Sequence, residues 1–271
     1  MIALLEFEFF RNAILAGILA SIACGIIGTY VVVKRLSFLG GGISHAAFGG
    51  IGLGYFLGVS PVLGATVFSL AAAGFISYLR RRAHQYMDTL IAAMWAVGMA
   101  VGILFIRWTP GYAPDLFSYL FGNILLVPST DLMMMIALDT VIVLTVWLLY
   151  NELLAVTFDE EFATIQNVPV ARVNAILLSL IALSVVMLIR VVGIILVIAL
   201  LTIPAAVSRI LTTRLYTMMV LSVILGCLFT LGGIALSYYL DAPSGATIIL
   251  LSAVTYGIVL ARSGRIRSEA M

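Results

Sequence analysis

Two titratable side chains lie inside long apolar stretches of this chain, where they have the chemistry to bind an ion. His45 follows three glycines, in a stretch (residues 40–58) where eight of the nineteen residues are glycine. Imidazole is a common metal ligand, but a histidine here is as well placed to form a structural hydrogen bond across helices. Asp139 lies in an apolar stretch as well, where it either contributes to an ion path or pairs with an interfacial or basic partner. Both residues are therefore candidate ligands on a metal path.

The chain lacks the sequence patterns of the enzymes that would hydrolyse a nucleotide or a peptide. Neither the phosphate-binding pattern G-x-x-x-x-G-K-[ST] nor H-E-x-x-H or G-x-S-x-G occurs. Lys34 is the only lysine, and two histidines are too few for a site of several imidazoles within one copy. We expect no catalytic activity and no stably bound cofactor. Energy for any transport must then come from an ion gradient or another protein.

The composition assigns these residues to a membrane protein. Of the 271 residues, 63% are hydrophobic and only 10% charged, and the mean hydropathy is +1.23. A soluble domain carries about 25% charged residues, so a soluble enzyme is excluded. A net charge of +2 offers no basic face for nucleic acid. The two cysteines, Cys24 and Cys227, have no paired spacing and predict neither a disulfide nor a zinc site.

Continuous apolar runs long enough to cross a bilayer as helices, about 20 residues each, predict an all-α bundle. We expect about nine transmembrane helices, with eight to ten as the range, in a single transmembrane domain over residues 1–271. They cover residues 12–33, 38–58, 61–79, 89–106, 132–150, 173–189, 193–211, 216–239 and 244–261. The start of the chain is expected to begin the first span and not to be a removable signal.

The distribution of basic residues predicts the orientation. With the N-terminus outside and the C-terminus cytoplasmic, the outer side keeps only Arg11, Arg107 and Arg190. The inner side collects Lys34, Arg35, Arg80, Arg81, Arg82, Arg172, Arg209, Arg214, Arg262, Arg265 and Arg267, as expected for a multi-pass protein of the cytoplasmic membrane. Counting 116–127 as a further span would reverse this bias downstream, so we interpret it as a re-entrant or interfacial helix. Asp131 is expected at an outer end as a screened surface carboxylate.

A polar segment, residues 151–171, interrupts the apolar pattern on the predicted inner side, and we call it the coupling segment. Within it, Phe158, Phe162 and Ile165 form one apolar stripe at helical spacing. The three acids between Phe158 and Phe162 favour a helix N-terminus, and Asn167 with Pro169 predicts its end. Nothing else in the chain is available to cover this short amphipathic helix. A protein partner is favoured over the membrane surface, because the acids would be repelled by anionic lipid.

Several stretches, in this order and spacing, resemble the membrane permease subunits of ATP-binding-cassette (ABC) importers for zinc, manganese and iron. They are Phe10–Ala13, Lys34–Phe38, Ile43–Ala46, Asp159–Ala163, Val192–Val197, Ile203–Ala206 and Asp241–Ala246. The resemblance covers nearly the whole chain.

This resemblance implies a homodimeric permease that carries a divalent transition-metal ion. Its partners would be a second copy, a cytoplasmic ATPase dimer that holds the ATP, an external metal-binding protein and the lipid bilayer, with no nucleic acid. Ser44-His45 matches the family's intramembrane motif, although many relatives have an acid where this chain has Gly41, so the metal stays open. The residues similar to the family's coupling helix are Asp159, Glu160, Glu161, Phe162, Ala163, Asn167 and Pro169.

Two other classes remain as alternatives. A proton-coupled secondary transporter of a metal or small solute would need titratable groups in its spans, and His45 and Asp139 are the candidates. An intramembrane enzyme would need a paired nucleophile and base, which the sequence does not offer.

Overall fold

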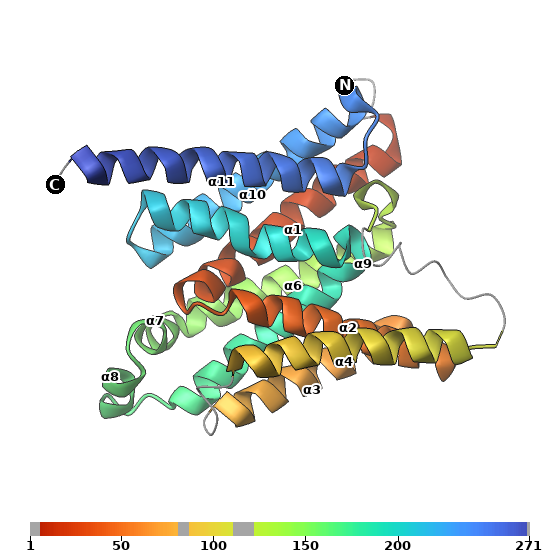
Figure 1. The fold of residues 1–271 in the computed structure, drawn as a ribbon, viewed down its shortest axis with the longest axis horizontal. Coiled ribbons are helices and arrows are strands. Elements are labelled where there is room, and N and C mark those ends of the chain that lie inside the picture. Colours follow the sequence, from red (N-terminus) through yellow and green to blue (C-terminus); the bar gives the residue numbers. More distant parts are fainter. Residues whose placement is uncertain (1–5, 81–86, 111–121, 270–271) are drawn as a thin grey trace.

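The fold of residues 6–80, 87–110 and 122–269, taken from a computed structural model, is a bundle of long helices (Figure 1). All regular structure in these residues is helical, which confirms the predicted all-α class. The bounds of the helices are α1 Glu8–Val33, α2 Ser37–Phe56, α3 Pro61–Arg80, α4 Met87–Trp108, η3 Ile124–Leu126, α6 Ser129–Leu148, α7 Tyr150–Phe158, α8 Glu160–Ile165, α9 Val170–Leu211, α10 Leu215–Leu240 and α11 Ser244–Glu269.

Eight stretches of the described residues are long and apolar enough to cross a membrane. They belong to α1, α3, α4, α6, both halves of α9, α10 and α11. The ninth predicted span is α2, which has 20 residues and so the same reach of about 30 Å. The predicted span contains eight glycines and one histidine within residues 40–58, and α3, α4 and α9 surround α2. The structure thus agrees with a polytopic bundle of about nine spans.

The glycines of α2 let its backbone touch the neighbouring helices directly. A Cβ on Gly52 would overlap the backbone of Gly102 in α4, and a Cβ on Gly50 would overlap Gly64 in α3. Gly54 also approaches the start of α3, as its spacing from Gly50 predicts. Gly58 has no such contact, and with φ of 68° it forms the turn into α3 instead.

α9 lies at the centre of the bundle and is broken once. It packs against α1, α2, α3, α10 and α11, and its backbone leaves the helical region at Gly193, with φ 78° and ψ 162°. A Cβ on Gly122 would overlap the backbone of Val192 and Gly193, so the segment before η3 packs directly on this break. The predicted boundary between the spans 173–189 and 193–211 lies at this break.

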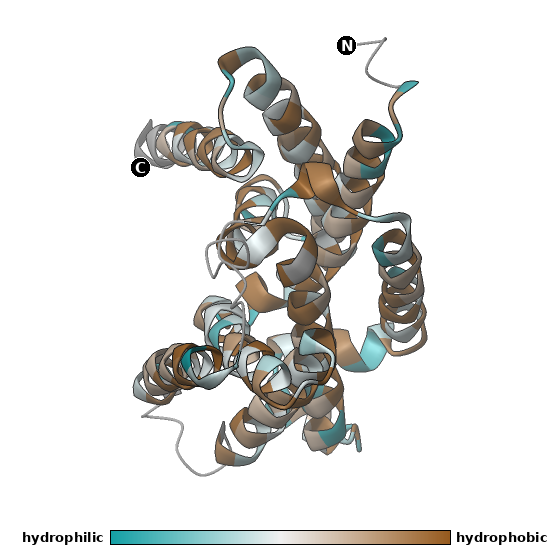
Figure 2. Cartoon of the chain, turned by 90° about the vertical axis from the view of Figure 1, so that its right-hand side faces the viewer, coloured by the Kyte–Doolittle hydropathy of each residue, from teal (hydrophilic) through white to brown (hydrophobic). Residues whose placement is uncertain are grey.

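Apolar side chains cover the outside of the long helices as well as the inside. Figure 2, where most helices are seen nearly end-on, shows hydrophobic residues around the periphery. Large exposed side chains include Val67, Val97, Leu104, Ile136 and Leu144. A water-soluble protein does not expose so much apolar surface, whereas acyl chains of a bilayer would cover it. Residues 12 to 33 of α1, by contrast, face mostly protein.

The two ends of the bundle differ in their polar contacts. At one end, α7 and α8 lie beside the turn between α1 and α2 (Figure 1), and Arg209 of α9 donates a hydrogen bond of 3.0 Å to the carbonyl of Val32. At the other end, Asn12 of α1 donates to the carbonyl of Val127, at 3.1 Å. Basic residues assigned to the inner side therefore gather at one end, while the direction of insertion stays a prediction.

The short stretch 116–127 is described only in part. Residues 116–121 lie outside the described residues, so the predicted re-entrant or interfacial helix stays a prediction there. Residues Ile124–Leu126 form one turn of 3-10 helix, capped by the side chain of Asn123, which accepts a hydrogen bond from the Leu125 amide. Cys24 and Cys227 are free cysteines in this structure.

Candidate functional site

His45 is buried in α2, and its ring is held by contacts on two sides. Its Nδ1 lies 2.8 Å from the carbonyl oxygen of Gly41, one helical turn earlier. The indole of Trp95 in α4 covers the ring, with 4.2 Å between ring centroids and 34° between the ring planes. The backbone of Gly98 touches the backbone of His45, which lets α4 come close enough for this stacking.

These contacts select the nitrogen that His45 has available for an ion. A carbonyl oxygen only accepts hydrogen bonds, so Nδ1 must carry the proton and donate it to Gly41. In the neutral ring this leaves the lone pair on Nε2. Metal-binding histidines have the same arrangement, in which the other ring nitrogen donates to a backbone carbonyl and fixes the ring.

The space beside Gly41 is occupied by the indole of Trp95. A Cβ on Gly41 would lie 3.3 Å from Cζ3 of that ring, so a larger side chain at position 41 would have to displace Trp95. No group of three or more His, Cys, Asp or Glu side chains gathers as a metal site within the described residues. Among the described contacts, the surroundings of His45 are an aromatic face and a backbone carbonyl.

Asp139 lies elsewhere in the bundle. It is buried in α6, which packs against α1 and α9, whereas α2 packs against α3, α4 and α9. Its Oδ2 atom is buried without a hydrogen-bond partner. The structure does not bring the two candidate ligands together, and a role for Asp139 in an ion path stays a prediction.

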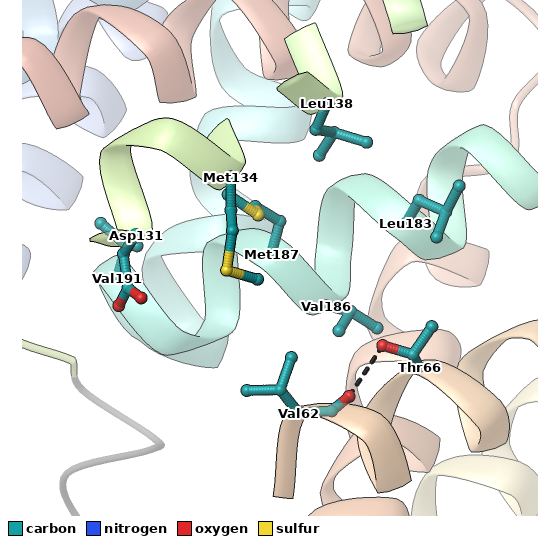
Figure 3. A pocket seen from close by; sticks show the side chains of 9 residues that line it. All are labelled: Val62, Thr66, Asp131, Met134, Leu138, Leu183, Val186, Met187 and Val191. Atoms are coloured by element: carbon teal, nitrogen blue, oxygen red, sulfur yellow. Dashed lines mark hydrogen bonds between the residues drawn. The ribbon is translucent and has the colours of Figure 1, made fainter. Parts of the chain in front are cut away.

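Asp131 is buried and not a screened surface carboxylate, because the first turn of α6 packs against α9. It borders a cavity of about 150 Å³ that side chains from α3, α6 and α9 line. Figure 3 shows Met134 in the middle of this lining, between Asp131 and Thr66. Thr66 donates its hydroxyl proton to the carbonyl of Val62 at 2.7 Å, which leaves the cavity mostly apolar.

The coupling segment has the predicted helix, with predicted start and end. Asp159 is its N-cap, and its carboxylate accepts hydrogen bonds from the amides of Glu161 and Phe162, at 3.0 and 2.9 Å. Asn167 adopts the left-handed conformation with φ of 58°, and Pro169 is the N-cap of α9. The turn of α8 is therefore fixed at both ends by the residue types that the sequence provides.

The predicted apolar stripe does not lie on one helix, because Asp159 has an extended backbone: Phe158 is the last residue of α7, and Phe162 and Ile165 belong to α8. All three side chains are exposed. Phe158, Phe162 and Ile165 have exposed fractions of 61%, 54% and 76%, while Ala163 on the opposite face is fully buried. Within the described residues, the stripe has no covering element. The stripe lies at the end of the bundle, next to the charged residues Lys34 and Glu160.

Lys34 makes contacts with α7 and α8 that its sequence position did not predict. Its Nζ donates to Oε1 of Glu160 at 3.0 Å and to the carbonyl of Val156 at 2.7 Å. Asn174 of α9 donates to the same Oε1 atom at 3.2 Å. The one signal in the sequence was that Lys34 is the sole lysine in a chain that otherwise uses arginine.

Comparisons with known proteins agree with this arrangement. Residues 6–263 match the ABC 3 transport family. An uncharacterized membrane protein of Synechocystis is 48% identical over 96% of this chain and 93% of its own length. The manganese transport system membrane protein MntC of Halalkalibacterium halodurans is 32% identical over 94% of this chain and 87% of its own length.

A solved structure shares the fold as well. The structure of PsaBC from Streptococcus pneumoniae in complex with Fab superimposes with a TM-score of 0.85 and 32% identity, covering 96% of this chain and 95% of that one. The match of the family over almost the whole chain and the relatives above 30% identity agree with the resemblance of the motifs. The chain therefore belongs to the ABC 3 transport family, the membrane permeases of metal ABC transporters.

Proposed function

We propose that this protein imports a divalent transition-metal ion across the cytoplasmic membrane, as the permease of an ABC importer. A second copy would complete the path, an external metal-binding protein would deliver the ion, and a separate ATPase dimer would supply the energy. The observation that carries this proposal is the exposure of Phe162 and Ile165 on α8, a capped helix at the end of the bundle. A secondary transporter would have no use for such a docking surface.

The ATPase would bind the stripe and move α8 when it closes on ATP. α8 lies between α7 and α9 in the chain, and only Gln166 to Pro169 separate it from the start of α9. A displacement of α8 therefore reaches the central helix of the bundle directly. The break at Gly193 separates the first span of α9, which follows α8 and receives the displacement, from most of the second span, Val191–Leu211.

His45 would be the protein ligand that the ion meets inside the membrane. The lone pair on Nε2 suits first-row divalent ions, and the hydrogen bond from Nδ1 to Gly41 holds the ring in place while the ion passes. We propose manganese as the first ion to test, because the relative from Halalkalibacterium is named for manganese transport. Zinc is the second, since imidazole suits it as well.

The docking surface is tested by recovery of the ATPase with the permease. Phe162→Ala combined with Ile165→Ala removes most of the exposed stripe, and we expect at least about a tenfold loss of bound ATPase. Leu240→Ala is the matched control, because Leu240 is equally exposed but lies at the end of α10 far from α8 in the chain. Equal recovery of the ATPase with both variants would overturn the assignment.

Transport is tested by uptake of radioactive manganese into liposomes that contain the permease and its ATPase. His45→Ala should abolish uptake while the complex still assembles, because no other imidazole lies in the spans. Normal uptake by this variant would make His45 structural. Uptake by the permease alone, driven by a pH gradient without ATP, would favour the secondary transporter and refute the ABC proposal.

A further inference from the structure

We propose that Lys34 is a positioning residue that links the coupling segment to α2, the helix that carries His45. This inference rests on the proposed function, because it assigns the route by which movement of α8 reaches the ion path. Lys34 is the C-cap residue of α1. Its ammonium group joins α1 to Val156 in α7 and to Glu160 in α8.

The link is enclosed by protein and not a loose surface ion pair. The side chain of Lys34 is only 3% exposed, and that of Glu160 is 37% exposed. A lysine is almost never buried to this extent unless its charge is paired. Asn174 of α9 donates to Oε1 of Glu160 as well, so one carboxylate holds α1, α8 and α9 together. A buried, multiply bonded pair transmits displacement better than an exposed pair, whose side chains reorient in water.

The other end of the link leads directly into α2. Only residues 34–36 separate α1 from α2, and this turn is tight. Arg35 has a left-handed backbone with φ of 57°, and the amide of Leu36 donates to the carbonyl of Val31 at 2.7 Å. His45 lies eight residues into α2, about 12 Å along its axis. A displacement of α8 therefore moves Lys34 through its ion pair with Glu160. Because the turn at residues 34–36 is short and tight, α2 moves with Lys34.

The alternative is a purely structural pair, which holds α8 on the bundle but takes no part in coupling. The two roles differ in one measurable ratio. A structural pair, once lost, loosens α8 and weakens binding of the ATPase. A positioning residue, once lost, leaves an ATPase that binds and hydrolyses ATP while less metal is moved for each ATP.

The experiment compares Lys34→Met with Arg214→Met in liposomes that contain the permease and its ATPase. Arg214→Met removes one positive charge from the same end of the bundle, at an exposed position before α10. With Lys34→Met we expect metal uptake per ATP hydrolysed to fall about tenfold, with ATPase recovery within about twofold of the parent protein. Arg214→Met should leave both quantities unchanged. Glu160→Gln, which keeps an oxygen acceptor for Lys34, should give a smaller loss in the same direction.

A second measurement needs neither the ATPase nor transport. Hydrogen exchange of the purified permease should show faster exchange in residues 160–166 of Lys34→Met than of the parent protein. If the parent protein shows no ATP-driven uptake, the proposed function fails, and hydrogen exchange still tests the contact. Unchanged exchange would overturn the link. Faster exchange with an unchanged ratio of metal to ATP would overturn the positioning role and leave a structural pair. If Lys34→Met does not fold, Glu160→Gln decides by the same two readouts.

Discussion

The close approach of α2 and α4 predicts that one added methyl group has opposite effects at two glycines. Gly52→Ala places a Cβ against the backbone of Gly102 in α4, and Gly74→Ala places one where no atom lies within 4 Å. Both positions are helical. The two substitutions are chemically identical, so their difference isolates the contact between the helices.

The size of the effect follows from the atoms that the methyl group would meet. A Cβ on Gly52 would lie 2.8 Å from Cα and 3.0 Å from C of Gly102, whereas carbon atoms pack at about 3.5–4.0 Å. These are backbone atoms, so no rotamer change relieves the overlap, and α4 must move away by about 1 Å. Overpacking of this kind costs about 1–3 kcal/mol. At Gly74 only the helix preference of alanine remains, which favours the folded state by about 0.5–1 kcal/mol.

Unfolding by sodium dodecyl sulfate in a mild detergent, followed by circular dichroism, measures both variants against the parent protein. We expect Gly52→Ala to be less stable than Gly74→Ala by about 1–3 kcal/mol, because the helix preference of alanine is the same at both positions. Because Trp95 stacks on His45 across the same interface between α2 and α4, Gly52→Ala should also lower metal uptake. If the two variants unfold at the same detergent fraction, the direct backbone contact between α2 and α4 is wrong.

Three further predictions concern single residues. Asp159→Ala removes the acceptor of two amide hydrogen bonds and should destabilise α8 by about 1 kcal/mol, visible as faster hydrogen exchange in residues 161–165. Asp159→Asn should retain the parent rate. Gly193→Ala forces a side chain onto a backbone with φ of 78° and should cost about 1–3 kcal/mol in detergent unfolding; Gly257→Ala, in open space, is its control. Asp139→Asn should keep uptake within about twofold, because its buried Oδ2 atom makes no hydrogen bond. Abolished uptake in a folded Asp139→Asn protein would place this residue on the ion path.

The sequence alone predicted the long helices well. Each of them is a continuous apolar run whose side chains face either other helices or lipid. The predicted span 216–239 corresponds to Leu215–Leu240, and 61–79 to Pro61–Arg80. Helix ends were missed where charged residues continue a helix beyond the apolar run, as at Glu8, since charge is tolerated at the membrane surface. The two ends of the coupling helix were predictable, because Asp159, Asn167 and Pro169 act locally. The position of Phe158 was not, since it ends α7 and the extended backbone of Asp159 separates it from α8.

Contacts between distant parts of the chain were not predictable in this way. Lys34 and Glu160 are 126 positions apart, and hydropathy assigns both to polar ends without pairing them. The break in α9 was visible only as a weak interruption, because one glycine with a positive φ leaves the apolar run intact. His45 was singled out by its depth in the membrane. Its hydrogen bond to Gly41 and the stacked ring of Trp95 depend on how α2 and α4 pack, which the sequence does not specify.

The same glycine contacts explain how a displacement of Lys34 would move His45. α2 touches α3 through Gly50 and Gly64 and touches α4 through Gly52 and Gly102, in both cases backbone to backbone. Side chains that lie between helices absorb small displacements by changing rotamer, whereas backbone atoms in contact cannot. The helices α2, α3 and α4 should therefore shift as one rigid body when the turn at residues 34–36 is displaced. His45 and Trp95 both belong to this body, so the coupling would move the histidine relative to α9 and keep its ring stacked on the indole.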